Sequence, residues 1–368
     1  MAPTIARHFA AVPDPRIDRT KKHALADILL VTLCAVVAGA ESWDSVATFG
    51  RSKLDWLKKF VPLAHGIPSP DTFERVFARL NPRAFQACVV AWLTAVCEAT
   101  GLKHVAIDGK AVRAAGGSTF SGCLHLVNAW SVENRMILGQ EAVADKSNEI
   151  AAIPKLLEVL DLRGALVTID AAGCQKAIAA QIRSQGGDYL LAVKGNQPAL
   201  EAAVQRVFEE AAETDAAVDG HTAAEDGHGR HEERTVTVIA DPKGLPPGWA
   251  DVAAVVQVGS EREVKGVNAT SVRYFITSRR GTAEELGRFV RRHWAVENEL
   301  HWCLDVTFRE DASRVASGHA GTNLGLIRRV ALSLLKQAPG KLTGPTKRLK
   351  AALDEAFLEQ VLQGNAAV

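Results

Sequence analysis

The sequence lacks the features that mark several classes of protein. It has six cysteines in 368 residues, and none of them forms a C-x-x-C pair. Neither a structural zinc site nor a disulfide framework is therefore expected, and reduced thiols fit the cytosol. No signal-peptide-like stretch occurs in the first 16 residues, where Pro13 and Pro15 interrupt the chain. The most apolar segment, Ile28–Ala40, is too short to cross a bilayer. We therefore expect a soluble cytoplasmic protein with no membrane partner.

An excess of either charge is also lacking, because 43 Lys and Arg face 42 Asp and Glu, a net charge of +1. The charges are nevertheless segregated. Val272–Trp294 holds six arginines and two glutamates, Lys336–Lys350 holds five basic residues and no acid, and Glu201–Glu233 holds ten acids and two arginines. Local basic patches can bind DNA by releasing its counterions, so the near-zero total does not exclude nucleic acid. Solvated helix faces are the alternative interpretation of each patch.

Two aspartates lie in the same sequence setting. Asp108 ends the apolar run in Lys103–Lys110, and Asp170 ends the one in Ala165–Ala172. Each pattern predicts a carboxylate on a buried strand or at its end. An ionised carboxylate is rarely buried without a partner or a metal, so the pair calls for a shared cation or a partner group.

A third acid lies in a predicted helix. Thr282-Ala-Glu-Glu285 has the pattern of a capping box and opens a helical run through about Asp305. Steps of four and three residues along it predict one inward stripe: Leu286, Val290, His293, Glu297, Leu300 and Leu304.

Glu297 is the one carboxylate in that stripe, and His293 and His301 flank it one turn away on each side. A partly exposed Glu297, paired with Arg291 or Arg292, is the alternative. Three convergent carboxylates would supply the oxygen ligands that Mg²⁺ or Mn²⁺ prefers. Two such ions clamp the attacking and leaving oxygens in phosphodiester cleavage or strand transfer.

Several motifs, in order, resemble those of a known family. They are Val105-Ala-Ile-Asp-Gly-Lys110, Ile169-Asp-Ala-Ala-Gly-Cys-Gln175, Lys194-Gly-Asn-Gln197, and His293-Trp-Ala-Val-Glu-Asn-Glu-Leu-His-Trp302 followed by Leu304-Asp-Val306. The chain resembles the DDE insertion-sequence transposases, in the branch that includes the H-repeat-associated proteins, from about His8 to about Arg329. The wider group often carries Tyr, Arg and Lys around its Glu, where this helix offers Phe289, His293 and Leu304.

The resemblance implies an α/β (α+β) ribonuclease H-like core with a β-rich insertion, preceded by a mostly helical domain. Asp108, Asp170 and Glu297 would be its catalytic triad and would bind two Mg²⁺ or Mn²⁺ ions. The activity implied is metal-dependent cleavage and strand transfer at insertion-sequence ends. A metal-dependent nuclease of the same fold and an inactive DNA-binding relic of a mobile element are the alternatives.

The sequence divides into three predicted parts. Residues 1–100 read as helices at Ala24–Ala38, Trp43–Leu57, Asp71–Leu80 and Pro82–Ala99, forming either a reader of DNA ends or a packing domain. Residues 101–335 would form the catalytic domain, with an insertion at about 200–281. Residues 336–368 read as a basic tail and helix.

Within the catalytic part, strands are predicted at His104–Arg113, Leu124–Ser131, Met136–Ala144, Ala165–Asp170 and Tyr189–Val193. Pro154 would start a helix that runs to Asp161, and a second helix would span Gln175–Gln185. This order puts Asp108 on the first strand and Asp170 at the end of the fourth, adjacent in the sheet. Glu213–Glu233 is predicted to be a polar connection inside the insertion.

The expected partner is double-stranded DNA, both the terminal inverted repeats of the element and its target, bound by a homodimer that pairs two ends. The expected location is the cytoplasm of a prokaryote, at the nucleoid. Around the acids, the predicted DNA contacts are Lys110, Arg113, Lys194, Arg291, Arg292, His293, Trp294, Asn298 and His301. Lys194 would touch a phosphate, and an aromatic ring such as Trp294 could stack on a distorted end base.

Overall fold

The computed structural model describes residues 8–96, 104–113, 123–143, 149–214, 218–227, 230–264 and 267–363. Its chain forms two compact units. We call residues 1–101, 109–152 and 296–368 the helical unit, and residues 102–108 and 153–295 the sheet unit. Within the described ranges, every helix is too short or too polar to cross a bilayer.

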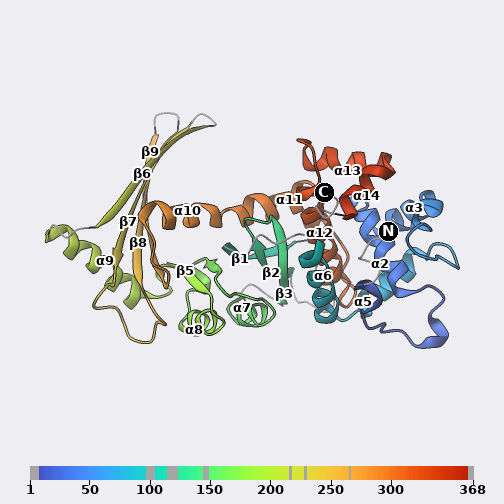
Figure 1. Cartoon of the computed structure of the whole chain (residues 1–368), viewed down its shortest axis with the longest axis horizontal. Helices are drawn as coiled ribbons and strands as arrows, with labels where there is room; N and C mark the ends of the chain where they lie inside the picture. The colour runs from blue at the N-terminus through green and yellow to red at the C-terminus, as the bar shows by residue number, and fades with distance from the viewer. Residues whose placement is uncertain are drawn as a thin grey trace. The chain divides into compact units, whose positions relative to one another are not determined.

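The N-terminal part of the helical unit is built from α-helices, drawn in blue to teal in Figure 1. They are α2 (Leu25–Val37), α3 (Trp43–Ser52), α4 (Leu54–Leu57), α5 (Pro70–Arg79) and α6 (Pro82–Val96). The predicted helices are confirmed, except that Trp43–Leu57 is divided at Lys53, and residues 97–99 of the last one lie outside the described ranges. Ser42 starts α3 with a capping box, in which its side chain accepts a hydrogen bond from the Ser45 backbone.

One buried helix, α12 (Ala320–Gln337), organises the helical unit. It contacts α2, α5 and α6, and also β2 (Leu124–Ser131) and β3 (Met136–Val143). The last helices, α13 (Gly344–Leu353) and α14 (Glu355–Gln363), also contact α12 and α2. Helices α13 and α14 therefore pack within this unit.

The interpretation of Lys336–Lys350 as an accessible basic patch that can bind DNA is wrong for two of its residues. Lys347 and Arg348 are buried, at 7% and 6% exposure. Lys347 Nζ donates to the carbonyls of Leu335 (2.9 Å) and Ala338 (2.6 Å), where α12 ends. Arg348 donates to the carbonyls of Thr307 and Val36. Carbonyls at helix ends have no hydrogen-bond partner within the helix, and Lys347 and Arg348 supply donors to such carbonyls. Their charged groups are therefore used inside the protein and are not exposed to DNA.

A nine-stranded mixed sheet runs in the order β3-β2-β1-β4-β5-β9-β8-β7-β6. The central strands β1 (His104–Val112), β4 (Leu166–Ile169) and β5 (Asp188–Val193) are parallel neighbours. The β2–β3 pair and the pairs from β5 through β6 are antiparallel. The predicted meander followed by two crossover strands is confirmed, as is the adjacency of the strands that carry Asp108 and Asp170.

Helix α7 (Glu149–Leu157) lies between β3 and β4 in the chain, and α8 (Lys176–Ser184) connects the parallel strands β4 and β5. The position predicted for Pro154 is wrong, because Pro154 lies inside α7 and not in its first turn. Proline removes only one backbone donor from the helix. The packing of the apolar face of α7, which includes the buried Ile153 and Leu156, keeps the segment helical despite this loss.

The insertion of the sheet unit contains α9 (Pro198–Glu213), β6 (Asp219–Gly227), β7 (Arg230–Ala240), β8 (Ala254–Val264) and β9 (Val267–Thr277). The predicted polar connection over Glu213–Glu233 is wrong for most of its length, since it forms β6 and the start of β7, paired antiparallel. The side chains of β6 are mostly exposed, so polar residues are compatible with an edge strand whose backbone bonds to β7. Helix α10 (Ala283–His293) covers β4, β6, β7 and β8, burying Leu286, Phe289 and Val290.

Candidate active site

Two acids lie on or directly after neighbouring parallel strands: Asp108 lies within β1, and Asp170 directly follows β4. The register pairs Ala106 with Thr168 and Ile107 with Ile169, so each acid is the next residue after one of the paired isoleucines. Asp108 is half-buried, whereas Asp170 is exposed, which corrects the expectation of a buried carboxylate. The cause is that β4 ends at Ile169 and Asp170 instead caps a turn at Ala171–Gly173, accepting a hydrogen bond from the Gly173 backbone (3.4 Å). Asp170 is therefore open to solvent at an edge where ligands commonly bind in α/β sheets.

Two side-chain amides from the end of β5 hold the turn that follows Asp170. Asn196 Nδ2 donates to the Ala171 carbonyl (2.6 Å), and Gln197 Nε2 donates to the Cys174 carbonyl (3.0 Å). In the sequence these residues belong to the Lys194-Gly-Asn-Gln197 motif, and no role was predicted for them. A sequence signal was present, since two consecutive amide residues in the turn after a strand are well suited to bond a neighbouring turn.

A hydrogen-bonded chain of three side chains lies behind Asp170. His104 Nε2 and His293 Nδ1 each lie 2.8 Å from Thr168 Oγ1, and Thr168 precedes Asp170 by two residues on β4. The His104 ring also packs edge-on against Phe289, with ring centroids 5.2 Å apart. These contacts fix α10 to the strand that ends at Asp170.

Both histidines of this hydrogen-bonded group, His104 and His293, are neutral. Burial lowers the pKa of His104 to about 3, with His293 and Arg292 acting in the same direction. Burial also lowers the pKa of His293 to about 4, against the opposing effect of the Asp170 charge. A neutral ring bonded to Thr168 is not a cationic phosphate ligand, so His293 is better described as a positioning residue than as the predicted DNA contact.

The helix that carries Glu297 is not continuous as predicted. Helix α10 ends at His293, a π-helical segment covers Val296–His301, and α11 spans Trp302–Val306. A π turn holds more residues than the 3.6 of an α-helical turn, so residues in it point in other directions than a uniform helix predicts. The predicted stripe is therefore interrupted at Glu297. Glu297 is exposed and not buried in that stripe, although Leu300 and Leu304 are buried as predicted.

The same segment contains a second carboxylate, and the two differ in their partners. Glu299 accepts from Arg135 Nε (2.7 Å) and lies 3.7 Å from Lys336 Nζ. Glu297 forms neither a hydrogen bond nor an ion pair with any residue in the described part of the chain. The carboxylate of Glu297 is therefore the one available for a ligand, whereas Glu299 has a structural partner.

A buried polar network anchors the π segment within the helical unit. His301 Nε2 lies 3.4 Å from Asn128 Nδ2, and Asn128 Oδ1 accepts from Arg329 Nε (2.5 Å). Arg329 also forms an ion pair with Glu310 (Nη1 to Oε1, 2.7 Å), and both side chains are fully buried. His301 is thus an anchor at the end of the segment that displays Glu297.

Lys110 has a similar structural role. It is only 7% exposed, and its Nζ lies 2.6 Å from Asp305 and 3.3 Å from Asp311. Because two carboxylates already neutralise this cation, we remove it from the predicted DNA contacts. Arg113, three residues further on and just after β1, is largely exposed, with its Nε 3.5 Å from Asp311 Oδ2.

The other predicted contacts lie in varied settings. Lys194 and Asn298 are exposed, Arg292 is half-buried, and Arg291 pairs with Glu225 (3.1 Å). Trp294 is 40% exposed, with the Arg273 guanidinium 5.8 Å from its ring centre. Their contacts with DNA stay predictions.

The three acids belong to both units, Asp108 and Asp170 to the sheet unit and Glu297 to the helical unit. Among the side chains that the structure describes, no three Asp, Glu, His or Cys residues gather as a metal-binding group. The convergence of the triad therefore stays a prediction.

Comparison with known proteins identifies the family to which the chain belongs. The model of the DDE_Tnp_1-associated family matches residues 6–93, and the model of the transposase DDE domain matches residues 99–334. The chain belongs to the transposase DDE domain family.

Similar proteins cover nearly the whole chain. YncI of Escherichia coli O157:H7, which is named as a transposase, is 39% identical over 96% of this chain and 93% of its own. The H repeat-associated protein YhhI of Escherichia coli K12 is 37% identical over 98% of both chains. A piggyBac transposase in a synaptic complex with hairpin DNA aligns with 99% of this chain and 78% of its own, at 10% identity and a TM-score of 0.43. That structural similarity is too low to assign fold or function.

Proposed function

We propose that the chain is a DNA transposase that cleaves insertion-sequence ends and joins them to target DNA, with a ribonuclease H-like core and a divalent-metal requirement. Its membership of the transposase DDE domain family supports the reaction class. The observation that supports the assignment to residues is the parallel register of β1 and β4, in which Ile107 pairs with Ile169 and the next residue in each segment is one of the two proposed ligands, Asp108 or Asp170. Glu297 completes the proposed triad.

The residues at this strand edge suit a hard divalent cation. Asp170 is exposed, and its one described hydrogen bond, a long one from the Gly173 backbone, leaves most of its lone pairs available. The uncommitted carboxylate of Glu297 has the same donor chemistry. Asp108, Asp170 and Glu297 would hold two Mg²⁺ or Mn²⁺ ions. Such ions would polarise the scissile phosphate and favour ionisation of the attacking water or 3′ hydroxyl.

The protein's own residues position these carboxylates. Asn196 and Gln197 fix the turn after Asp170, and the His104–Thr168–His293 chain fixes the strand before it. Sub-ångström placement of a ligand matters for catalysis because misaligned groups lose much of their effect. No protein nucleophile or covalent protein intermediate is required.

Double-stranded DNA is the proposed partner, namely the terminal inverted repeats and the target. Lys194, exposed at the end of β5, and Arg113, exposed after β1, are the best-placed of the predicted phosphate contacts. A homodimer is proposed for pairing two element ends.

The test uses the full chain and a plasmid that carries its coding sequence with the flanking DNA on both sides. With Mg²⁺ and a second, target plasmid, we expect strand breaks at the element ends and joined products. Cleavage without joining would favour the nuclease alternative, and binding without cleavage would favour an inactive relic.

Asp170→Asn tests the role of the carboxylate with almost no change in shape. Removal of its negative charge should lower cleavage by orders of magnitude while DNA binding persists. Asp161→Asn is the matched control, because Asp161 is an exposed residue of the same unit whose only described partner is Arg163. Equal activity in the two variants would contradict the metal-ligand role of Asp170.

A further inference from the structure

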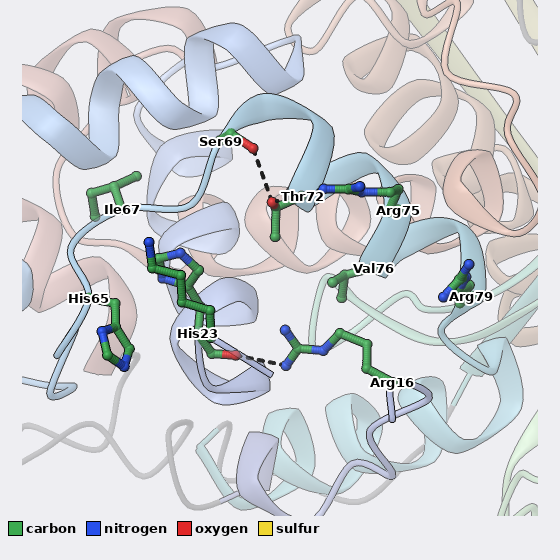
Figure 2. A pocket seen from close by; sticks show the side chains of 10 residues that line it. Arg16, His23, His65, Ile67, Ser69, Thr72, Arg75, Val76 and Arg79 are labelled. Atoms are coloured by element: carbon green, nitrogen blue, oxygen red, sulfur yellow. Dashed lines mark hydrogen bonds between the residues drawn. The ribbon is translucent and has the colours of Figure 1, made fainter. Parts of the chain in front are cut away.

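A basic cavity of about 690 Å³ lies in the N-terminal part of the helical unit, away from all three acids in sequence. Figure 2 shows the side chains that line it, which come from the segment before α2, the loop before α5, and α5 itself. They are Arg16, Lys22, His23, His65, Ile67, Ser69, Thr72, Arg75, Val76 and Arg79. No acid is among them.

Three of the lining cations have no counter-ion in the described part of the chain. Arg16 is neutralised by Asp14, which accepts from its Nε (2.9 Å) and Nη2 (2.8 Å). By contrast, Lys22, Arg75 and Arg79 form no ion pair with any described residue, and all three are exposed. Their charges are therefore available to a ligand.

Helix α5 separates its charges by side. Arg75 and Arg79 are four residues apart, and so project from successive turns toward the basic cavity (Figure 2). The acids of the same helix, Asp71 and Glu74, line a different cavity. This division concentrates positive charge on one side of a ten-residue helix.

Neutral donors complete the lining. The hydroxyls of Ser69 and Thr72 lie 3.0 Å apart at the first turn of α5, and the Ser69 side chain caps no backbone donor of the helix. The positive end of the helix dipole lies at the same turn. His23 and His65 meet edge to face across the loop, with centroids 6.3 Å apart.

We propose that this cavity binds a phosphate group. Three uncompensated cations, two hydroxyls and a helix N-terminus on one concave surface form the donor set that phosphate oxygens accept. A DNA backbone and a free phosphate ion offer this same chemistry. The DNA source rests on the proposed function, whereas the free-ion source does not.

The first experiment measures phosphate without DNA. The melting temperature of the full chain is compared in sodium phosphate and in sodium chloride at equal ionic strength and pH. Phosphate should raise it by more for the wild type than for the double variant Arg75→Gln/Arg79→Gln, which keeps only the general stabilising effect of a kosmotropic salt. In the described part of the chain, the Arg75 side chain hydrogen-bonds only to the Asp71 carbonyl and the Thr72 hydroxyl, both in its own helix, so the double variant should fold.

The matched control is Arg83→Gln. Arg83 is 66% exposed on the next helix, lies 3.5 Å from Glu141, and lines a different cavity. This variant should retain the phosphate-dependent shift in melting temperature.

The second experiment measures affinity for a labelled duplex of the element's flanking DNA at several salt concentrations. Each lost phosphate contact should reduce the slope of log affinity against log salt by about 0.9, so the double variant should lose about 0.9 to 1.8 while the control is unchanged. A smaller slope identifies a backbone phosphate as the ligand. A phosphate-dependent melting shift with an unchanged slope identifies a free ion.

If neither readout depends on Arg75 and Arg79, the proposal is overturned. If the chain binds no DNA at all, the proposed transposase function fails, and the melting experiment still decides whether the cavity binds phosphate.

Discussion

Acid should weaken the sheet unit because His104 is buried in its neutral form. The His104 ring is fully buried, and its pKa in the folded protein is about 3, whereas an exposed histidine has a pKa near 6.5. As the pH falls below about 6.5, the unfolded chain takes up a proton that the folded protein refuses until about pH 3. Stability is therefore complete above pH 6.5 and is lost progressively between these two values.

The magnitude follows from the linkage relation, about 1.4 kcal/mol per pH unit for one proton. Between pH 7 and pH 5, only the interval below 6.5 contributes, which gives about 2 kcal/mol for His104. This corresponds to a roughly 30-fold increase in the opening constant of the strands it joins. His293, with a pKa of about 4, acts in the same direction.

Hydrogen exchange of β4 peptides at pH 7 and pH 5, corrected for intrinsic exchange rates, measures this opening constant. His104→Gln keeps an amide near Thr168 Oγ1 and removes the titration, so its pH-dependent loss should be smaller than that of the wild type by about 2 kcal/mol. His221→Gln, a partly exposed site on β6 of the same unit, should behave as the wild type does. Equal losses for wild type and His104→Gln would refute the reasoning.

Three other predictions concern the two units separately. Glu310→Ala should destabilise the helical unit by about 3–5 kcal/mol in urea unfolding, since it leaves the Arg329 guanidinium buried without its counter-ion; a loss below about 1 kcal/mol would contradict this. Asn196→Ala should raise the Mg²⁺ concentration needed for half-maximal cleavage without changing DNA affinity, because it frees the turn after Asp170; an unchanged metal titration would show that the amide does not position that carboxylate. Glu297→Gln should abolish cleavage at an unchanged melting temperature, whereas Glu299→Gln should lower the melting temperature slightly and retain cleavage; the reverse pattern would exchange their roles.

The strands and their order could be predicted from the sequence because the information is local. β-Branched apolar runs at Val105–Ile107 and Leu166–Ile169 specify strands, and the two antiparallel strands and the helix between them return the chain so that the two runs are parallel. The carboxylates that follow the two runs are then the residues next after the paired Ile107 and Ile169. Amino-acid composition predicted the wrong structure for β6, where strand pairing decides the conformation. Its residues are polar, yet they form a strand because β7 supplies the backbone hydrogen bonds.

The partners of the polar side chains could not be predicted, since they come from segments far apart in the sequence. His104, Thr168 and His293 meet only after β1, β4 and α10 have packed, and nothing in any one segment signals the other two. Lys110 follows Asp108 closely enough to suggest a shared ligand, yet its charge is used by Asp305 and Asp311. A basic residue near an acidic site therefore indicates a DNA contact only when its counter-ions are known.

The π segment shows why periodicity placed the third predicted acid, Glu297, wrongly in a buried stripe. A stripe with a period of 3.6 residues assumes a uniform helix, whereas Val296–His301 adds width to each turn and so rotates the residues within it. In the uniform helix, Glu297 would face the core, where its charge would need a partner within the protein. In the π segment, Glu297 is exposed to solvent, and Glu299 forms ion pairs with Arg135 and Lys336. Because π turns cost stability and recur at functional sites, the local departure from helical geometry is itself an argument that a free carboxylate at Glu297 serves a ligand.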